Sequence, residues 1–264
     1  MGTNEQVAQA FVVARRNATA LDRYPGSPPV DLPSAYDIQD HAIAIDGRPV
    51  AGWKVGRIFP PDSERLGAER LVGPIFADQI FRVAPGEEPA MPVFAGGFAA
   101  AEAEILVRVG PSRDGHVPHD DAGVRTIVEE VCLGIEIASS PYPRINADGP
   151  PVTASDFGNN AGLVIGQPLA GWSERDLNAI TAVSLVNDRE VGRGSVATML
   201  DGPYGAVRFL LAHLRDRGIA APASLWVSTG AVTGVHPVEP GDHFRASFEG
   251  LGDTCCRIVA ASAS

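Results

Sequence analysis

The chain has few of the features that mark extracellular or membrane-spanning proteins. Its 264 residues include only three cysteines, at positions 132, 255 and 256, which form neither a disulfide framework nor a metal-ligand spacing. No apolar run approaches the roughly 20 residues needed to span a bilayer. Residues 3–16 carry charges within a helical pattern, unlike a signal peptide. These absences predict a cytoplasmic protein without a membrane partner.

Basic residues are also scarce relative to acidic ones. The chain has 21 Lys and Arg against 32 Asp and Glu, which gives a formal net charge of -11. This excess argues against a general nucleic-acid binder, because such proteins need basic surface. It does not exclude a small anionic substrate, since a buried cation can invert the local field of an acidic protein.

Glycine and proline are plentiful, with 29 and 22 residues, and short apolar segments alternate with turns from Gly47 onward. This texture predicts a β-rich structure rather than a helix bundle. The expected strands are residues 50–55, 73–81, 98–109, 133–138 and 161–165, followed by a hairpin of 180–186 and 190–199 and by further strands in 225–260.

Helices are expected mainly at the N-terminus. Thr3 and Gln6 form a capping-box pattern at the start of one helix, and Ser34 is expected to cap a second. Two more helices are expected at 121–131 and 203–217. No repeat or linker is visible. We therefore predict one α+β domain, mostly β, with a helical N-terminal region (1–46) and a β core (47–264).

Three glutamates on apolar segments are the strongest candidates for chemistry. Glu102 and Glu104 lie two residues apart on a predicted strand, so their side chains share one face. Such a pair is more often a solvated face, but Glu136 is a third carboxylate on another apolar strand. Carboxylates without His or Cys form a hard oxygen site, which favours Mg²⁺ or Mn²⁺ over Zn²⁺.

Lys54 and Asp78 are weaker candidates. Lys54 is a cation within an otherwise apolar strand, between two glycines that allow a ligand to approach the backbone closely. A lysine whose ammonium reaches solvent would fit the same pattern. Asp78 follows an apolar segment and could equally be a turn residue.

The order and spacing of these segments resemble the fumarylacetoacetate hydrolase superfamily. Within it, they resemble the 2-keto-4-pentenoate hydratase and 4-oxalocrotonate decarboxylase branch. The likeness covers nearly the whole chain. It lies in residues 52–56, 76–78, 101–105, 134–137, 192–195, 203–207, 228–231, 240–242 and 250–252. Two regions that border the substrate pocket in the family depart from its pattern, namely 153–162 and 140–144.

The resemblance implies a mixed β-roll core like the fumarylacetoacetase C-terminal domain, a homo-oligomer, and a small 2-oxo or 2-hydroxy carboxylic acid as ligand. It implies Mg²⁺ or Mn²⁺ on Glu102, Glu104 and Glu136. Lys54 and Asp78 become the catalytic polar pair beside the metal.

Four further residues are candidates for substrate binding. Ser228 and Thr229 match a Ser/Thr-Gly turn that donates hydrogen bonds to the substrate carboxylate in the family. Arg57 and Arg144 could recognise a second carboxylate on a dicarboxylic substrate, although each could equally be a surface arginine.

These expectations favour a hydratase that adds water to a 2-hydroxy-2,4-dienoate and gives a 4-hydroxy-2-oxo acid, in the catabolism of aromatic compounds after meta-cleavage. A decarboxylase of a 2-oxo-3-enedioate needs the same electron sink, so the ligand set does not separate the two. A carbon–carbon hydrolase is a further alternative. The resemblance implies that such an enzyme has a histidine before the strand of Glu102 and Glu104 to activate water, but the chain has no histidine between His41 and His116. The last alternative is a protein that binds a metal or ligand without catalysing a reaction.

Overall fold

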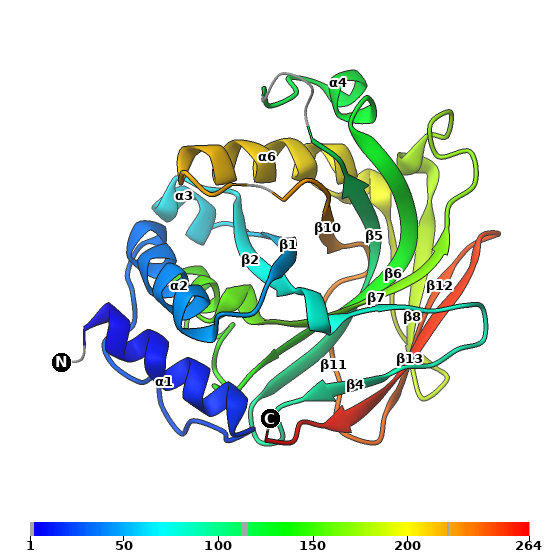
Figure 1. Cartoon of the computed structure of the whole chain (residues 1–264). Coiled ribbons are helices and arrows are strands. Elements are labelled where there is room, and N and C mark those ends of the chain that lie inside the picture. The colour runs from blue at the N-terminus through cyan, green and yellow to red at the C-terminus, as the bar shows by residue number, and fades with distance from the viewer. Residues whose placement is uncertain (1–2, 112–115, 221, 264) are drawn as a thin grey trace.

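Two mixed β-sheets form the framework of the chain (Figure 1). The computed structural model describes residues 3–111, 116–220 and 222–263. The larger sheet has the strand order β2-β1-β10-β5-β6-β7-β3, with β11 beside β5. These strands are β1 (Val50–Arg57), β2 (Arg70–Phe76), β3 (Ile80–Arg82), β5 (Phe98–Val109), β6 (Val128–Ser140), β7 (Asn160–Pro168), β10 (Leu225–Ala231) and β11 (His236–Pro237).

The smaller sheet has the order β4-β13-β12-β8-β9. Its strands are β4 (Ala90–Val93), β8 (Thr181–Val186), β9 (Arg189–Ser195), β12 (His243–Phe248) and β13 (Gly252–Ala260). The hairpin between β8 and β9 turns at Asn187 and Asp188, both of which have positive φ. This confirms the predicted hairpin, since paired positive φ values are what a two-residue turn between twisted strands requires.

The helices lie around the larger sheet (Figure 1). α1 (Asn4–Arg16) and α2 (Leu32–Asp46) pack together beyond β2, and α6 (Gly202–Asp216) packs against β10. The predicted capping box of Thr3 and Gln6 is present. The second helix begins earlier than predicted, because the Asp31 carboxylate, not Ser34, caps it and accepts a hydrogen bond from the Ser34 N–H. The short helices are α3 (Asp62–Leu66), α4 (Asp121–Arg125) and α5 (Pro150–Ser155).

Other sequence-based boundaries were also wrong. The second arm of the predicted hairpin, 190–199, ends at Ser195, where the 3₁₀ turn η4 (Val196–Thr198) begins. The helix predicted for 121–131 ends at Arg125, and β6 begins at Val128. Val128 and Val131 supply apolar, β-branched partners for β5, so sheet pairing outweighs their helical spacing. The strand predicted for 73–81 is divided into β2 and β3 by the 3₁₀ turn η1 (Ala77–Gln79).

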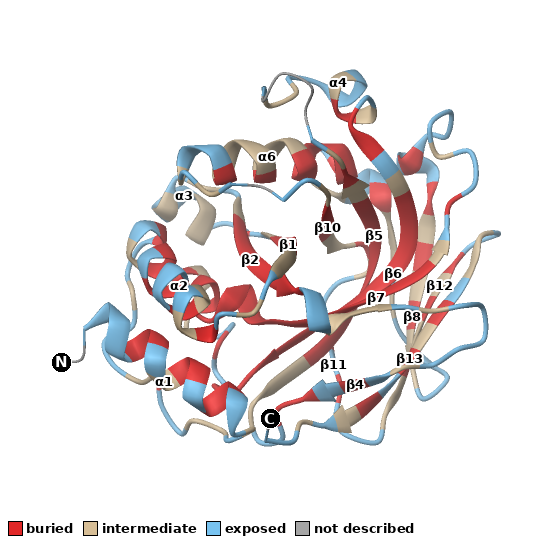
Figure 2. Ribbon diagram, in the orientation of Figure 1, coloured by how far each residue is buried: buried red, intermediate tan, exposed pale blue. Residues whose placement is uncertain are grey.

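The core lies between the sheets and under the helices, where Figure 2 shows the buried residues concentrated. One apolar cluster includes Ile105 and Leu133 of the larger sheet together with Phe244 of the smaller one. Burial of such side chains is the main favourable term in folding. Among the described residues, no helix is both long and apolar enough to cross a membrane.

A left-handed turn packs tightly against β2. The 3₁₀ turn η2 (Phe157–Asn159) has φ values of 56°, 60° and 58° at its three residues. Bulky residues adopt this conformation only when their surroundings enforce it. A Cβ on Gly73 would lie 1.9 Å from the Phe157 carbonyl oxygen. Glycine at position 73 therefore allows this turn to reach the sheet.

We expect Gly73→Ala to destabilise the protein by about 1–3 kcal/mol or more, since its methyl group would meet backbone that cannot move aside. Gly56→Ala is the matched control between the same two strands, because its methyl group would meet a Leu71 side-chain carbon at 3.4 Å, an ordinary contact. The measurement is the free energy of unfolding in urea. Equal values for the two variants would contradict this account.

Candidate metal centre and substrate cavity

The register of β5 and β6 brings the three glutamates together. Glu102 pairs directly with Glu136, and Glu104 lies two residues further along the same face. Gly134 is opposite Glu104 and leaves space beside it. The three side chains are buried, and one carboxylate oxygen from each lies within 4.8 Å of the others. The structure thus brings together the three glutamates singled out from the sequence.

The neighbouring strands complete the site. β10 is irregular between Ser228 and Ala231, and at this irregularity the Ser228 hydroxyl and the Gly230 N–H both donate to Glu104 Oε2, the latter at 3.1 Å. β1 lies next to β10, with Lys54 paired to Ser228. The Lys54 ammonium therefore reaches across the sheet to 3.5 Å from Glu136 Oε1. Lys54 is the only lysine in the chain.

The charge at this site fits a divalent cation. Three ionised carboxylates and one ammonium leave an excess of two negative charges in a buried place, which is unfavourable without compensation. Two carboxylate oxygens, Glu104 Oε1 and Glu136 Oε2, are buried and lack a hydrogen-bond partner among the described residues. Buried orphan acceptors on an all-oxygen donor set are suited to a hard cation such as Mg²⁺ or Mn²⁺.

The pKa shifts express the same imbalance. Burial, reinforced by Glu136 and opposed by Lys54, raises the pKa of Glu102 to about 8. Burial and the other two glutamates raise the pKa of Glu104 well above its usual range. For Lys54, burial alone would lower the pKa, but the three carboxylates outweigh it and raise the pKa above its ordinary value. Without a cation, protons on Glu102 and Glu104 reduce the negative charge of the site.

Two asparagines belong to the site and were not predicted from the sequence. Asn159 Oδ1 accepts a hydrogen bond from Lys54 Nζ at 3.2 Å, and its amide nitrogen donates to Asn146 Oδ1 at 2.9 Å. The Asn160 side-chain amide donates to Glu136 Oε1 at 2.9 Å. Both lie within 153–162, where the chain departs from the family pattern. The signal available was the pair of adjacent asparagines before an apolar strand.

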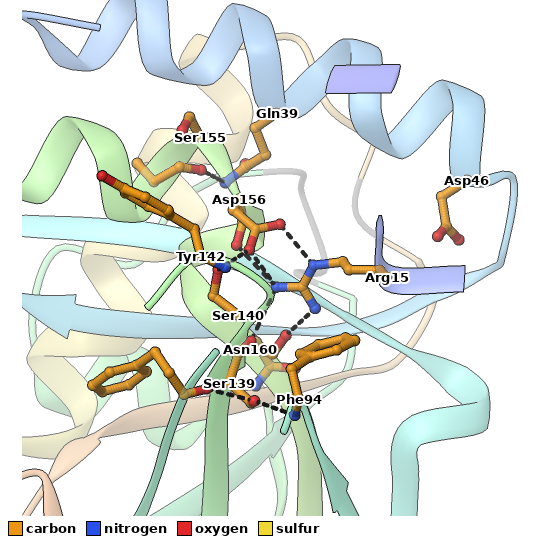
Figure 3. Close-up of polar contacts among 12 residues, drawn as sticks. Arg15, Gln39, Asp46, Phe94, Ser139, Ser140, Tyr142, Ser155, Asp156 and Asn160 are labelled. Carbon is orange, nitrogen blue, oxygen red and sulfur yellow. Dashed lines mark hydrogen bonds and ion pairs between the residues drawn. The ribbon is translucent and has the colours of Figure 1, made fainter. Parts of the chain in front are cut away.

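A buried ion pair supports these asparagines from the N-terminal helix (Figure 3). Arg15 of α1 donates two hydrogen bonds to the Asp156 carboxylate, at 2.6 and 2.9 Å. Its remaining nitrogen donates to the Asn160 carbonyl oxygen at 3.1 Å. Ser140 Oγ also donates to Asp156, at 2.6 Å. Bidentate pairing of this kind fixes geometry, so α1 holds both ends of the turn that carries Asn159.

A cavity of about 750 Å³ opens in front of the site. Lys54, Glu102, Asn159 and Thr229 line its inner part. The Thr229 hydroxyl donates to the Ile105 carbonyl oxygen at 2.7 Å. The remaining lining combines apolar and basic side chains, including Ile58, Phe59, Met199, Leu200, Val235, Arg57 and Arg70. Asp62 also lines it, and Arg70 is 3.6 Å from the Asp201 carboxylate, so Arg57 is the lining arginine that the described residues leave without a carboxylate partner.

The other residues singled out from the sequence are placed differently. Arg57 lines the cavity and donates to the Thr198 carbonyl oxygen at 3.4 Å. Ser228 is fully buried and contacts Glu104 rather than the cavity.

Asp78 and Arg144 are not brought to the site. Asp78 is exposed in η1 and forms an ion pair with Arg48 at 3.2 Å. Arg144 is exposed and pairs with Asp148 at 2.6 Å. Neither is among the described residues that line the cavity. A short turn after β2 directs Asp78 outward, and Arg144 finds a partner four residues along the turn that follows β6.

Comparison with known proteins gives two kinds of relative. The chain is 26% identical over 216 residues to a 4-oxalocrotonate decarboxylase of Pseudomonas putida, covering 81% of this chain and 79% of the relative. It is 28% identical over 262 residues to 2-keto-4-pentenoate hydratase 2 of Dechloromonas aromatica (strain RCB), covering 95% and 97%. No family model matches the chain.

The fold is also shared with solved structures. The 4-oxalocrotonate decarboxylase from Pseudomonas putida G7, complexed with magnesium and adipate, superposes with a TM-score of 0.79 over 97% of both chains at 23% identity. The chain is thus similar in sequence to these enzymes and shares the fold of the solved decarboxylase. As the sequence resemblance predicted, its relatives are hydratases and decarboxylases of one branch.

We expect the metal-free protein to lose stability as pH rises from about 5 to 8. The folded state keeps a proton on Glu102 up to about pH 8, whereas the unfolded chain releases it near its ordinary pKa of 4.5. Between these two pH values the folded state binds more protons, so the free energy of unfolding falls as pH rises. At a free concentration 100 times its Kd, Mg²⁺ or Mn²⁺ should add about 2.7 kcal/mol, or roughly 5–10 °C in Tm.

Thermal unfolding with and without chelator at several pH values measures this. At a fixed metal concentration, the increment should grow with pH, because the cation displaces the protons. Glu102→Gln should flatten the pH dependence of the metal-free protein. A metal-free Tm independent of pH, or a metal effect retained in Glu102→Gln, would count against the site.

Proposed function

We propose that this protein is a divalent-metal-dependent hydratase that converts a 2-hydroxy-2,4-dienoate to a 4-hydroxy-2-oxo acid. The observation that carries the proposal is the buried set of three carboxylates with one lysine at the inner end of a cavity. Relatives named 2-keto-4-pentenoate hydratase, which align with nearly the whole chain, support the choice of reaction. Catabolism of aromatic compounds is the corresponding pathway class.

Glu102, Glu104 and Glu136 would hold Mg²⁺ or Mn²⁺, because all-oxygen donors suit these cations. When bound, the cation supplies a Lewis acid for the carboxylate and 2-oxygen of the substrate. Ser228 and the Gly230 N–H fix the orientation of Glu104 through their hydrogen bonds. Such support holds a ligand in its productive geometry.

Lys54 acts on the substrate directly in this proposal. Its ammonium lines the cavity and is held by Asn159 and Glu136. It would bind the substrate carboxylate or the oxyanion at C2 and move the proton that converts the dienol to the ketone. The resulting conjugated ketone accepts water at C4. Thr229 borders the same space, and its hydroxyl would donate to the substrate carboxylate in place of the Ile105 carbonyl oxygen.

Arg57 would bind a second carboxylate at the outer end of the cavity. It stacks on Phe59 at 4.7 Å, and the described residues give it no ion pair, so its charge is available to a ligand. Asp78 and Arg144 are left out of the proposed machinery because of their positions. A homo-oligomer remains a prediction, measurable by light scattering.

The second candidate is a decarboxylase of a 2-oxo-3-enedioate. The relative of that name favours it, and the same carboxylates and lysine would serve it. A carbon–carbon hydrolase is less well supported, because no histidine is among the described residues that line the cavity.

The test is a spectrophotometric assay of 2-hydroxy-2,4-dienoates of different length, with and without a terminal carboxylate, in Mg²⁺ or Mn²⁺. We expect loss of dienoate absorbance and a product heavier by one water, abolished by chelation. Lys54→Met should lower kcat/KM by about 10²–10⁴-fold, the usual contribution of proton transfer. Arg57→Ala should raise KM for dicarboxylic substrates only.

Arg144→Ala and Asp78→Asn are the controls, and each should keep near-normal activity while the fold is intact. Loss of activity in Asp78→Asn would restore the role that the resemblance implied. Evolution of CO₂ without added water would favour the decarboxylase. Metal binding without turnover of either substrate class would contradict both activities.

A further inference from the structure

A second group of potential metal ligands lies on the smaller sheet, away from the three glutamates. Glu88, His243 and Cys255 each offer one ligand atom, and these atoms lie within 4.8 Å of one another. His243 Nε2 is 3.1 Å from Glu88 Oε1. Neither the proposed reaction nor the resemblance uses these residues.

Strand register brings the three side chains together. β12 and β13 are antiparallel, with His243 opposite Arg257 and Arg245 opposite Cys255. His243 and Cys255 are therefore diagonal neighbours on one face of the sheet. β4 runs parallel to β13 with Ala90 opposite Arg257, so Glu88, just before β4, arrives level with Cys255. The cluster thus joins three adjacent chain segments.

The donor types differ from those of the first site. A thiolate, an imidazole and a carboxylate form a mixed S, N, O set, which selects a borderline cation such as Zn²⁺ over Mg²⁺. At ordinary Zn–S and Zn–N lengths, tetrahedral ligand atoms lie about 3.3–3.8 Å apart. Ligand atoms already within 4.8 Å of one another reach that arrangement by small side-chain movements.

The surrounding charge favours a cation. Two arginines lie beside the cluster, Arg257 opposite His243 and Arg245 opposite Cys255. Arg245 is 2.8 Å from Asp188 and 3.8 Å from Asp253, so its charge is offset by two carboxylates. Glu88 adds a further negative charge at the cluster itself. The site would therefore be attractive to a divalent ion even with Arg245 on the same face.

A cavity leaves room for a fourth ligand. It has a volume of about 290 Å³ and is lined by all three candidate ligands. One buried atom of another lining residue on the same face, Arg245 Nε, has no hydrogen-bond partner among the described residues. A bound water or small anion that accepts a hydrogen bond would satisfy this N–H group.

We propose that Glu88, His243 and Cys255 form a second metal site, selective for Zn²⁺ or a similar transition-metal ion, with an exogenous fourth ligand. Bound there, the ion cross-links the segment before β4 to β12 and β13. The site is structurally separate from the three glutamates and does not depend on the proposed hydratase activity.

The test is titration of the metal-free, reduced full-length protein with Co²⁺, followed by absorption spectroscopy. Thiolate ligation gives a sulfur-to-cobalt charge-transfer band, which a carboxylate-only site cannot produce. We expect one equivalent of Co²⁺ to produce this band and Zn²⁺ to displace it. Glu102→Gln/Glu104→Gln should keep the band, so failure of the first site would not affect the result.

Cys255→Ser should abolish the band, whereas Cys132→Ser and Cys256→Ser, which change buried thiols outside the cluster, should keep it. His243→Ala and Glu88→Gln should each weaken Co²⁺ binding by at least about tenfold. Absence of a sulfur-to-cobalt band, its persistence in Cys255→Ser, or unchanged affinity in His243→Ala would overturn the proposal.

Discussion

The burial of three carboxylates beside one ammonium is the constraint on which the rest of the site depends. Buried carboxylates within 4.8 Å of one another repel strongly, and the ammonium of Lys54 offsets only one of the three negative charges. The metal-free protein relieves the remainder by raising the pKa values of Glu102 and Glu104. Hydrophobic burial elsewhere must therefore stabilise a fold that keeps this cluster out of water. A divalent cation removes the repulsion at its source.

The surrounding structure serves to hold the ends of these side chains in place. The irregularity in β10 directs Ser228 and an N–H group at Glu104, and the left-handed turn presents Asn159 to Lys54. That turn is reached from α1 through Arg15, so the N-terminal helix contributes to the site from outside the sheet (Figure 3). A few hydrogen bonds thus fix the orientation of Glu104 and Lys54 at the site.

Sequence patterns predicted the mostly β fold, the N-terminal helices and the shared face of Glu102 and Glu104, because these follow from periodicity and capping. They failed where tertiary pairing decides: Val128 and Val131 fit a helix locally but pair with β5. The adjacent asparagines were visible in the sequence, but the contact of Asn159 with Lys54 was not, since it spans 105 residues and depends on a strained turn. Asp78 resembles a catalytic residue in sequence, but only the turn after β2 reveals its outward direction.

The most direct measurement is anomalous diffraction from a crystal grown with Mn²⁺. The account predicts one strong manganese peak within coordination distance of carboxylate oxygens from Glu102, Glu104 and Glu136, with Lys54 facing the same space. Manganese bound elsewhere with these three side chains free of it, or side chains turned apart in the metal-loaded protein, would contradict the central claim.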